Sequence, residues 1–330
     1  MEGFLKPFCK MVIIIHLCPK FHKIMNRISP AVYISALLAM AFWALSFIWY
    51  KEVLVAYKPV SLVLMRLVIS SSILVVVSLA LRKLQVLKKK DVKIFLLLTF
   101  FQPFLYFLCE SYGISMVSST LAAVIISTIP LFSPIGAYFL LGERISLVNF
   151  FGILISVIGV TMVVFHAGFS NINVSLPGVI LMMGAVVAAI GYAITIRRLG
   201  NRYNVFSIVT YQNTLGILFF LPLFFWLDYK QFITVTPTRS VIIPLISLGI
   251  FSSTVAFILF TYVIKKLSIS RANVFTNAIP VLTAIFAYFI LGEELTPVML
   301  MGIAVVIFGV LVAQVSRKSK SVDPIDVEAN

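Results

Sequence analysis

Long apolar runs alternate with short polar connections along almost the whole chain. Because a helix that crosses a membrane requires about 20 mostly apolar residues, the runs predict ten transmembrane helices. Their predicted ranges are 30–50, 60–81, 93–111, 117–141, 147–166, 175–196, 205–227, 241–263, 271–291 and 297–315. The connections are too short to contain a soluble domain. The predicted fold class is therefore an all-α integral membrane protein.

The two ends of the chain fall outside this pattern. Residues 11–18 are apolar but too short to span a membrane, and lysines flank them without a small-residue cleavage site. Residues 1–28 are therefore predicted to be a cytoplasmic extension. Two alternatives stay open for it: an interfacial segment, or an over-extended reading frame whose translation starts at Met25. Residues 316–330 are polar and predict a disordered cytoplasmic tail.

The placement of basic residues predicts how the chain is oriented. If the N-terminus is cytoplasmic, alternation of ten helices places most of the 26 Lys and Arg residues on the cytoplasmic side, the largest cluster being loop 82–93. The outside then receives only Lys51, Lys58, Lys230 and Arg239. This bias is typical of proteins in a plasma (cytoplasmic) membrane. It supports the helix number and predicts that both termini are cytoplasmic.

Composition agrees with a membrane protein and argues against several other classes. Hydrophobic residues make up 61% and charged residues 11% of the chain, whereas a soluble domain has roughly 25% charged residues. The net charge of +15 comes from short clusters between apolar runs, so no nucleic-acid partner is expected. The few cysteines and histidines show no metal-ligand spacing, so neither a metal nor a cofactor is predicted: Cys9, Cys18, Cys109, His16, His22 and His166.

An internal repeat links the two halves of the chain. The pattern from Ile129-Pro130 to Leu141-Gly142-Glu143 recurs 150 residues later as Ile279-Pro280 to Leu291-Gly292-Glu293, and two later glycines recur at the same offset. The predicted repeats, 29–166 and 175–315, contain five helices each. Because five is an odd number, the second repeat must enter the membrane from the opposite side. Inverted repeats of this kind are typical of secondary transporters.

The paired Pro…Gly-Glu…Gly…Gly pattern, together with Trp43 and Arg66, resembles the EamA type of the drug/metabolite transporter superfamily over about residues 30–315. The resemblance implies ten helices in two inverted halves, a central cavity and alternating access. It also implies export or exchange of amino acids and related metabolites. A carrier of the same fold for drugs, phosphorylated compounds or sugar metabolites is the alternative. The expected partners are a small solute and lipid, with the protein a monomer or homodimer.

Two charged residues inside the spans are the first candidates for the transport site. Arg66 lies within an apolar span, where a charge usually faces a cavity or a partner; a snorkelling interfacial anchor is the alternative. Glu110 lies at a similar predicted depth, so we expect the two to pair or to share an outer vestibule, unless Glu110 is a solvated helix end. Glu143 and Glu293 are expected to be structural acids at the start of a helix.

Further polar and aromatic residues in the spans suit an amphipathic solute and are candidates for lining the cavity. With Arg66 and Glu110, they are Trp43, Ser46, Gln102, Tyr106, Tyr192, Tyr211, Asn213, Tyr262, Asn273 and Asn277. Pro130 and Pro280 correspond in the repeat and are candidate hinges, with simple packing kinks as the alternative. The spans offer no pair of acids and no central histidine, so no catalytic residue and no enzymatic activity is predicted.

Overall fold

The structure, a computed structural model, describes residues 30–129, 131–132, 147–169, 175–199, 202–267 and 275–315. The described residues form helices joined by short turns, and no strand occurs among them. The predicted terminal segments, 1–28 and 316–330, lie outside these ranges. So do Pro130, Asn273 and Glu143.

In the N-terminal part of the described chain, helices cover four of the predicted spans and the beginning of a fifth, the span 117–141. Its elements are α3 (Pro30–Leu54), α4 (Pro59–Ala80), the short turn η1 (Lys89–Asp91), α5 (Val92–Thr99), the π-helical turn η2 (Phe100–Leu105), α6 (Tyr106–Met116), α7 (Ser119–Ile126) and α9 (Leu147–Phe169). Elements η1 to α6 follow one another directly along the chain and together form one apolar segment, Lys89–Met116.

The C-terminal part is built in the same manner. Its elements are α10 (Leu176–Leu199), α11 (Val205–Leu223), the π-helical turn η4 (Phe224–Asp228), α12 (Tyr229–Phe232), α13 (Arg239–Ser247), the π-helical turn η5 (Leu248–Val255), α14 (Ala256–Leu267), α16 (Ala278–Phe286), the π-helical turn η6 (Ala287–Leu291) and α17 (Pro297–Val315).

Six helical rods among the described residues are long and apolar enough to cross a membrane. Large apolar side chains such as Trp226, Phe289 and Leu147 are more than three-quarters exposed. A water-soluble protein seldom leaves so much apolar surface uncovered, whereas lipid accepts it. The predicted class, an all-helical membrane protein, is therefore confirmed.

Several of the predicted spans are interrupted near prolines. Gln102 has extended backbone angles (φ −148°, ψ 119°) within η2, and the peptide bond to Pro103 is cis. Pro222 and Pro244 lie just before the π-helical turns η4 and η5. Proline removes one backbone hydrogen bond and clashes with the preceding turn. The regular α-helix is therefore lost close to each of these residues.

The described part of the predicted span 117–141 contains another interruption. Helix α7 ends at Ile126, and residues 127–128 form a turn. A similar turn at 276–277 precedes α16. Pro280, the described hinge candidate, is buried three residues into that helix.

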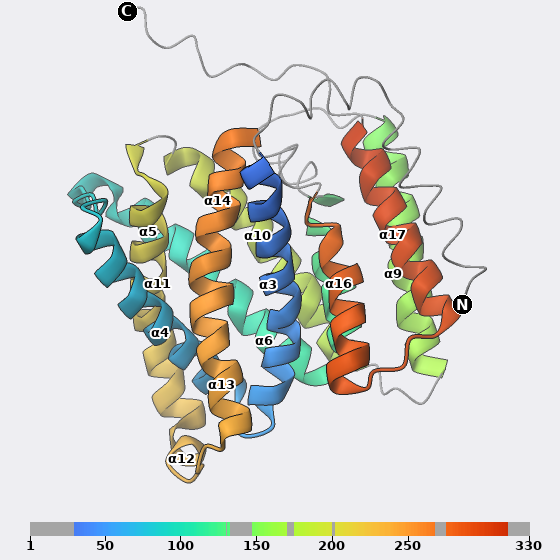
Figure 1. Ribbon diagram of the computed structural model, residues 1–330, viewed down its shortest axis with the longest axis horizontal. Coiled ribbons are helices and arrows are strands. Elements are labelled where there is room, and N and C mark those ends of the chain that lie inside the picture. Colours follow the sequence, from blue (N-terminus) through green and yellow to red (C-terminus); the bar gives the residue numbers. More distant parts are fainter. Residues whose placement is uncertain are drawn as a thin grey trace, which may run out of the picture.

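The helices stand side by side, so that their connections gather at two opposite ends (Figure 1). Helix α12 and the loop from η6 to α17 lie at one end, and the start of α3 and the end of α14 lie at the other. Helix α3 is central, since it contacts α13, η5, α14, α16, α6 and α7. Side chains contributed by both parts of the chain form one continuous apolar core around it.

Helices α9 and α17 form a separate pair at the side of the molecule (Figure 1), and no other two of the described elements are in more extensive contact. Three glycines allow their backbones to touch. A Cβ added at Gly159 would lie 2.8 Å from the carbonyl oxygen of Gly302, and one at Gly309 would lie 2.6 Å from the amide nitrogen of Ser156. Small residues at such a contact are typical of helix pairs in membranes. The glycines that recur in the sequence repeat therefore face one another.

Polar contacts tie the α4–α5 connection to the start of α11 at one end of the molecule. Asp91 is buried and accepts hydrogen bonds from Arg202 Nη1 (2.6 Å) and from the Tyr203 hydroxyl (3.0 Å). The Tyr211 hydroxyl donates to the Gln85 carbonyl (2.8 Å). This connection contains the large basic cluster of residues 82–93, so these hydrogen bonds hold the backbone of the cluster in place.

Candidate functional site

A charged arginine lies buried among the helices, on α4. Arg66 is only 2% exposed. Its Nη1 donates to the Tyr50 hydroxyl (2.7 Å) and lies 3.9 Å from Glu110 Oε2. The guanidinium also stacks 4.3 Å from the centre of the Phe107 ring. A permanent positive charge is stable at this position because a carboxylate, hydroxyl groups and an aromatic face surround it.

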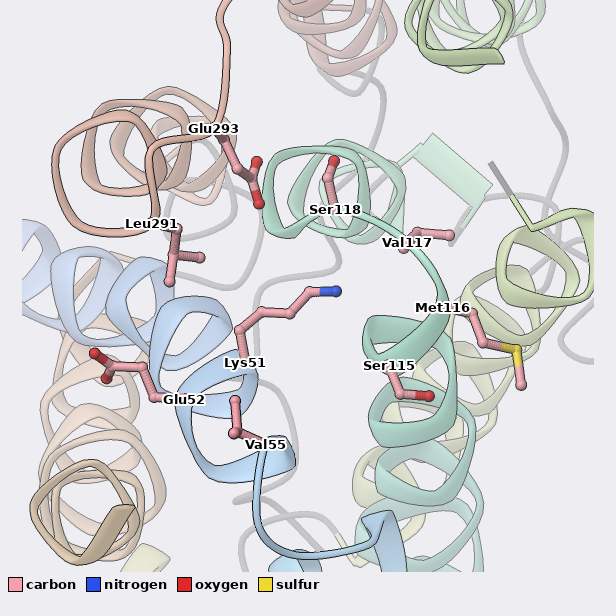
Figure 2. A pocket seen from close by; sticks show the side chains of 9 residues that line it. All are labelled: Lys51, Glu52, Val55, Ser115, Met116, Val117, Ser118, Leu291 and Glu293. Atoms are coloured by element: carbon pink, nitrogen blue, oxygen red, sulfur yellow. The ribbon is translucent and has the colours of Figure 1, made fainter. Parts of the chain in front are cut away.

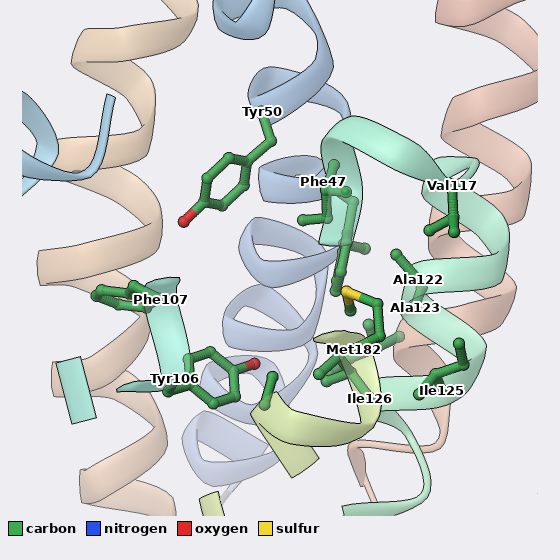
Figure 3. Packing of buried hydrophobic residues seen from close by; sticks show 14 of the residues in the cluster. Phe47, Tyr50, Tyr106, Phe107, Val117, Ala122, Ala123, Ile125, Ile126 and Met182 are labelled. Atoms are coloured by element: carbon green, nitrogen blue, oxygen red, sulfur yellow. The ribbon is translucent and has the colours of Figure 1, made fainter. Parts of the chain in front are cut away.

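Two tyrosines hold the carboxylate of Glu110 on α6. The Tyr106 hydroxyl, one helical turn earlier, donates to Oε1 (3.0 Å), and the Tyr50 hydroxyl lies 3.2 Å from Oε2. Figure 3 shows the Tyr50 ring reaching from α3 toward Phe107 and Tyr106 of α6. Tyr50 is thus placed between the two charges, and three elements (α3, α4 and α6) contribute to the cluster.

The C-terminal part of the chain completes this cluster through η5. Arg66 Nη2 donates to the Ser252 hydroxyl (3.0 Å), and its Nε donates to the Ser253 hydroxyl. Element η5 approaches α4 closely, since a Cβ added at Gly249 would lie 2.5 Å from a side-chain carbon of Ile69. The π-helical turn after Pro244 thus presents two neighbouring hydroxyls to one guanidinium.

Hydrogen bonds extend the cluster further between the two parts of the chain. The Ser70 hydroxyl, one turn after Arg66 on α4, lies 3.0 Å from the Thr254 hydroxyl. Asn213 Nδ2 on α11 donates to the same Ser70 hydroxyl (2.9 Å). We call Tyr50, Arg66, Tyr106, Glu110, Ser252 and Ser253 the Arg66–Glu110 cluster. It is charge-balanced and lies where the N-terminal and C-terminal parts meet.

The structure thus brings four of the candidate residues into this cluster or its extension: Arg66, Glu110, Tyr106 and Asn213. Neither charged residue is exposed. The alternatives of a snorkelling anchor for Arg66 and a solvated helix end for Glu110 therefore do not describe this structure. The paired arrangement does.

Other candidates lie elsewhere. Trp43 packs edge-on against the ring of Phe260 (centroids 4.9 Å apart), and the Ser46 hydroxyl donates to the Trp43 carbonyl of its own helix. Tyr192 and Tyr211 belong to an apolar cluster with Phe95, Leu98, Leu199, Tyr203 and Ile208. Tyr262 is 38% exposed and makes no described contact with the Arg66–Glu110 cluster.

Two candidate amides are buried away from the cluster. Gln102 lies at the interruption in η2 and is 8% exposed. Asn277 lies just before α16 and is 7% exposed, and both its amide nitrogen and its amide oxygen lack a hydrogen-bond partner. Because a buried, unpaired amide is costly, Asn277 has the greatest unused hydrogen-bonding capacity of the candidates that the structure describes.

Tyr50, Ser252 and Ser253 were not predicted from the sequence. Tyr50 stands near the end of its apolar run, where an interfacial aromatic residue is common, so nothing singled it out. The run Ser252-Ser253-Thr254 inside an apolar span was a visible signal, because three consecutive hydroxyls in a membrane helix need partners.

Two helices have their N-termini capped by acidic side chains that belong to other elements. Glu293 accepts hydrogen bonds from the Ser119 amide (2.8 Å) and the Thr120 hydroxyl (2.8 Å) at the start of α7. Asp228 in η4 accepts from the Ser61 amide (2.8 Å) in the first turn of α4. The expected structural role of Glu293 fits this position, but it caps α7 and not the helix that follows it. A negatively charged side chain stabilises a helix N-terminus whether or not it belongs to that helix.

No group of three or more His, Cys, Asp or Glu side chains that could hold a metal ion occurs in the part of the chain that the structure describes. The arrangement offers neither a nucleophile beside a base nor a pair of free acids among these residues. It is a buried ion pair held by hydrogen bonds from neighbouring hydroxyl groups.

The apolar rods and the charge pair that they bury define a class: a polytopic helical membrane protein with polar groups between its helices. The model of the EamA-like transporter family matches residues 30–165 and again residues 176–314. The chain belongs to this family, as the resemblance in the sequence predicted.

Individual relatives agree with the family. The chain is 30% identical over 263 residues to the uncharacterized transporter YetK of Bacillus subtilis, and the match covers 79% of each chain. It is 25% identical to a probable terminal-alkyne amino-acid exporter of Streptantibioticus cattleyicolor, over 58% of this chain and 62% of that one. A solved crystal structure has a similar fold, with a TM-score of 0.64, 18% identity and coverage of 87% of this chain and 99% of that chain.

Proposed function

We propose that the protein is a secondary transporter that exports a small metabolite, an amino acid or a related compound, across the plasma membrane by alternating access. Ten helices in two inverted halves, residues 29–166 and 175–315, with both termini cytoplasmic, form the proposed architecture. The two separate matches of the family model support two related halves. The amino-acid exporter among the relatives supports the solute class.

The observation that carries the proposal is the Arg66–Glu110 cluster. Arg66, Tyr50 and Glu110 come from the N-terminal half, whereas Ser252 and Ser253 come from the C-terminal half. Charged groups within membrane-spanning segments usually face the interior of the helix bundle or the pathway of a solute, and they seldom face lipid. A carboxylate of the solute that replaces Glu110 beside Arg66 would change how the two halves are held together. Such an exchange links solute binding to movement of the halves.

Among the described residues, Asn277 is the second proposed contact for the solute. Its unpaired amide has both a donor and an acceptor to offer. It lies at the interruption before α16, and interrupted helices commonly form the solute site of transporters. We propose Trp43, Ser46, Gln102, Tyr192, Tyr211, Tyr262 and Asn273 as weaker candidates, and Pro130 and Pro280 as hinges.

The solute class can be tested before the compound itself is identified. Metabolites are profiled in the medium of cells that overproduce the protein and of cells that lack it, and the compound that differs most is offered to proteoliposomes. We expect saturable uptake that is accelerated by the same compound on the opposite side. Uptake that never saturates would indicate a channel and contradict the proposal.

The role of the cluster requires variants. Arg66→Gln and Glu110→Gln should each reduce uptake at least tenfold while the protein still elutes as a single species in detergent. Arg239→Gln, at an exposed position outside the cluster, is the matched control and should transport normally. A drug, phosphorylated or sugar-metabolite substrate remains the alternative. It would be supported if the accumulated compound carried no carboxylate.

The inverted arrangement has its own test. Cysteines introduced at Gly142 and Gly292, two equivalent positions of the repeat, should react with impermeant reagents from opposite sides of the membrane. Labelling of both from the same side would contradict the proposed inversion.

A further inference from the structure

A second polar site lies at the end of the bundle where α3 and α6 finish. A cavity of about 550 Å³ opens there between the end of α3, the α6–α7 turn and the residues that follow η6. Figure 2 shows Lys51, Ser118 and Glu293 around it, and Ser115 and Glu52 at its edges. It shares no lining residue with the Arg66–Glu110 cluster. In the proposed orientation, this end faces the outside.

Lys51 is the cation of this cavity. It belongs to the last turn of α3 and is half-buried. Figure 2 shows its side chain crossing the cavity, with the amino group on the side of Ser118. Among the residues that the structure describes, no hydrogen bond or ion pair involves this ammonium group, since the described ion pairs are those of Arg66 and Arg202. Its three N–H donors are therefore available.

Glu293 lies close enough to attract the Lys51 ammonium group, but neither nearby acid forms a hydrogen bond or ion pair with it. Glu293 already accepts hydrogen bonds from the backbone and side chain at the start of α7, and the helix N-terminus offsets its charge. Glu52 follows Lys51 directly on α3, and its carboxylate points away from Lys51 in Figure 2. Consecutive residues of a helix do not face each other. The N–H donors of the ammonium group are thus not used by either acid.

Ser118 supplies a second donor. Its hydroxyl oxygen accepts a hydrogen bond from the Leu121 amide (3.1 Å) as the cap of α7. Its own proton has no acceptor within the described ranges of the chain, so it can donate to a ligand. Lys51 and Ser118 line the same cavity, so a carboxylate bound between them can accept a hydrogen bond from each.

We propose that this cavity binds the carboxylate group of the transported solute at the outer mouth, with Lys51 as its charge partner and Ser118 as its second donor. That the bound anion is the transported solute rests on the proposed function; anion binding at Lys51 does not. Ion pairs that water reaches contribute little affinity. Binding is therefore weak, as release of the solute to the outside requires.

The test uses the full-length protein in proteoliposomes, in a cysteine-free background with the reporter Ser115→Cys. Ser115 is exposed and lines the cavity. Its reaction rate is measured with two impermeant thiosulfonate reagents, one anionic (sulfonate) and one cationic (trimethylammonium). We expect Lys51→Gln to lower the ratio of anionic to cationic rates several-fold, because it removes the local positive charge.

Lys58→Gln is the matched control, because Lys58 is exposed on the same end of the molecule but does not line the cavity. Sodium propionate should slow labelling more than propionamide, its neutral analogue, and only when Lys51 is present. The proposal is overturned if Lys51→Gln has no more effect than Lys58→Gln. It is also overturned if propionate and propionamide protect equally.

The two proposals can fail separately. Protection by propionate, without saturable transport of any compound, would remove the proposed function and leave the anion site in place. Saturable export with no effect of Lys51→Gln on the labelling ratio would leave the function in place and remove this site.

Discussion

The buried pair of Arg66 and Glu110 allows a prediction about stability that depends on which partner is removed. We consider Arg66→Ala, Glu110→Ala and the double variant. The two side chains are 3% and 7% exposed, so water cannot replace a lost partner. Arginine stays charged in proteins, whereas a glutamate can take up a proton and become neutral. The two single variants should therefore differ.

The structure gives the size of the effect. The charges approach to 3.9 Å, which corresponds to an attraction of about 4 kcal/mol at an effective dielectric constant of about 20. Leaving one buried charge without its partner costs about 3–5 kcal/mol. Glu110→Ala should reach this range, because Arg66 keeps its charge. Arg66→Ala should lower the free energy of unfolding by less, because Glu110 can become neutral and keep its hydrogen bonds to Tyr50 and Tyr106.

The free energy of unfolding is measured in mixed micelles with a rising fraction of denaturing detergent. The double variant should lose less than the two single losses combined, by about 1–3 kcal/mol. Glu294→Ala, at an exposed acid, is the control and should change little. Additive losses, or a greater loss in Arg66→Ala than in Glu110→Ala, would refute the reasoning.

Three more predictions concern positions outside this pair. Gly159→Ala should lower the unfolding midpoint in detergent clearly more than Gly184→Ala, because the added Cβ meets the backbone of α17 at 2.7 Å in the first case and a cysteine sulfur at 3.1 Å in the second; equal midpoints would contradict the close α9–α17 contact. Glu293→Gln should cost about 1 kcal/mol of unfolding free energy by weakening the cap of α7, and Glu294→Gln should cost nothing measurable; the reverse order would contradict the assignment of the cap. Asn277→Leu should keep or raise the unfolding midpoint, because it removes two unpaired polar atoms, and should lower uptake by proteoliposomes; a loss of stability with normal uptake would show that the amide is structural.

The sequence alone determined that the chain is a helical membrane protein. Burial of an apolar segment in lipid is nearly additive along the segment, so it follows from consecutive residues whatever helices pack against them. The helices α3, α4 and α17 lie within a few residues of the predicted ranges for this reason. The cost of a charge in a span also singled out Arg66 and Glu110.

The interruptions could be predicted only in part. Proline marks where a helix is disturbed, and Pro103, Pro222 and Pro244 all lie beside irregular turns. The kind of disturbance was not predictable. Whether a π-helical turn or an extended residue results depends on what packs against the freed backbone, as Gly216 does against Pro103.

Only the tertiary structure decided which polar residues meet. Helix α4 is apolar on nearly every side, so its sequence does not show which face Arg66 occupies. The rotation of α3 brings Tyr50 to Arg66, and the π-helical turn η5 brings Ser252 from far along the chain. Helix rotation in lipid depends on side-chain fit between neighbouring helices and not on hydropathy, and it therefore belongs to the folded molecule as a whole.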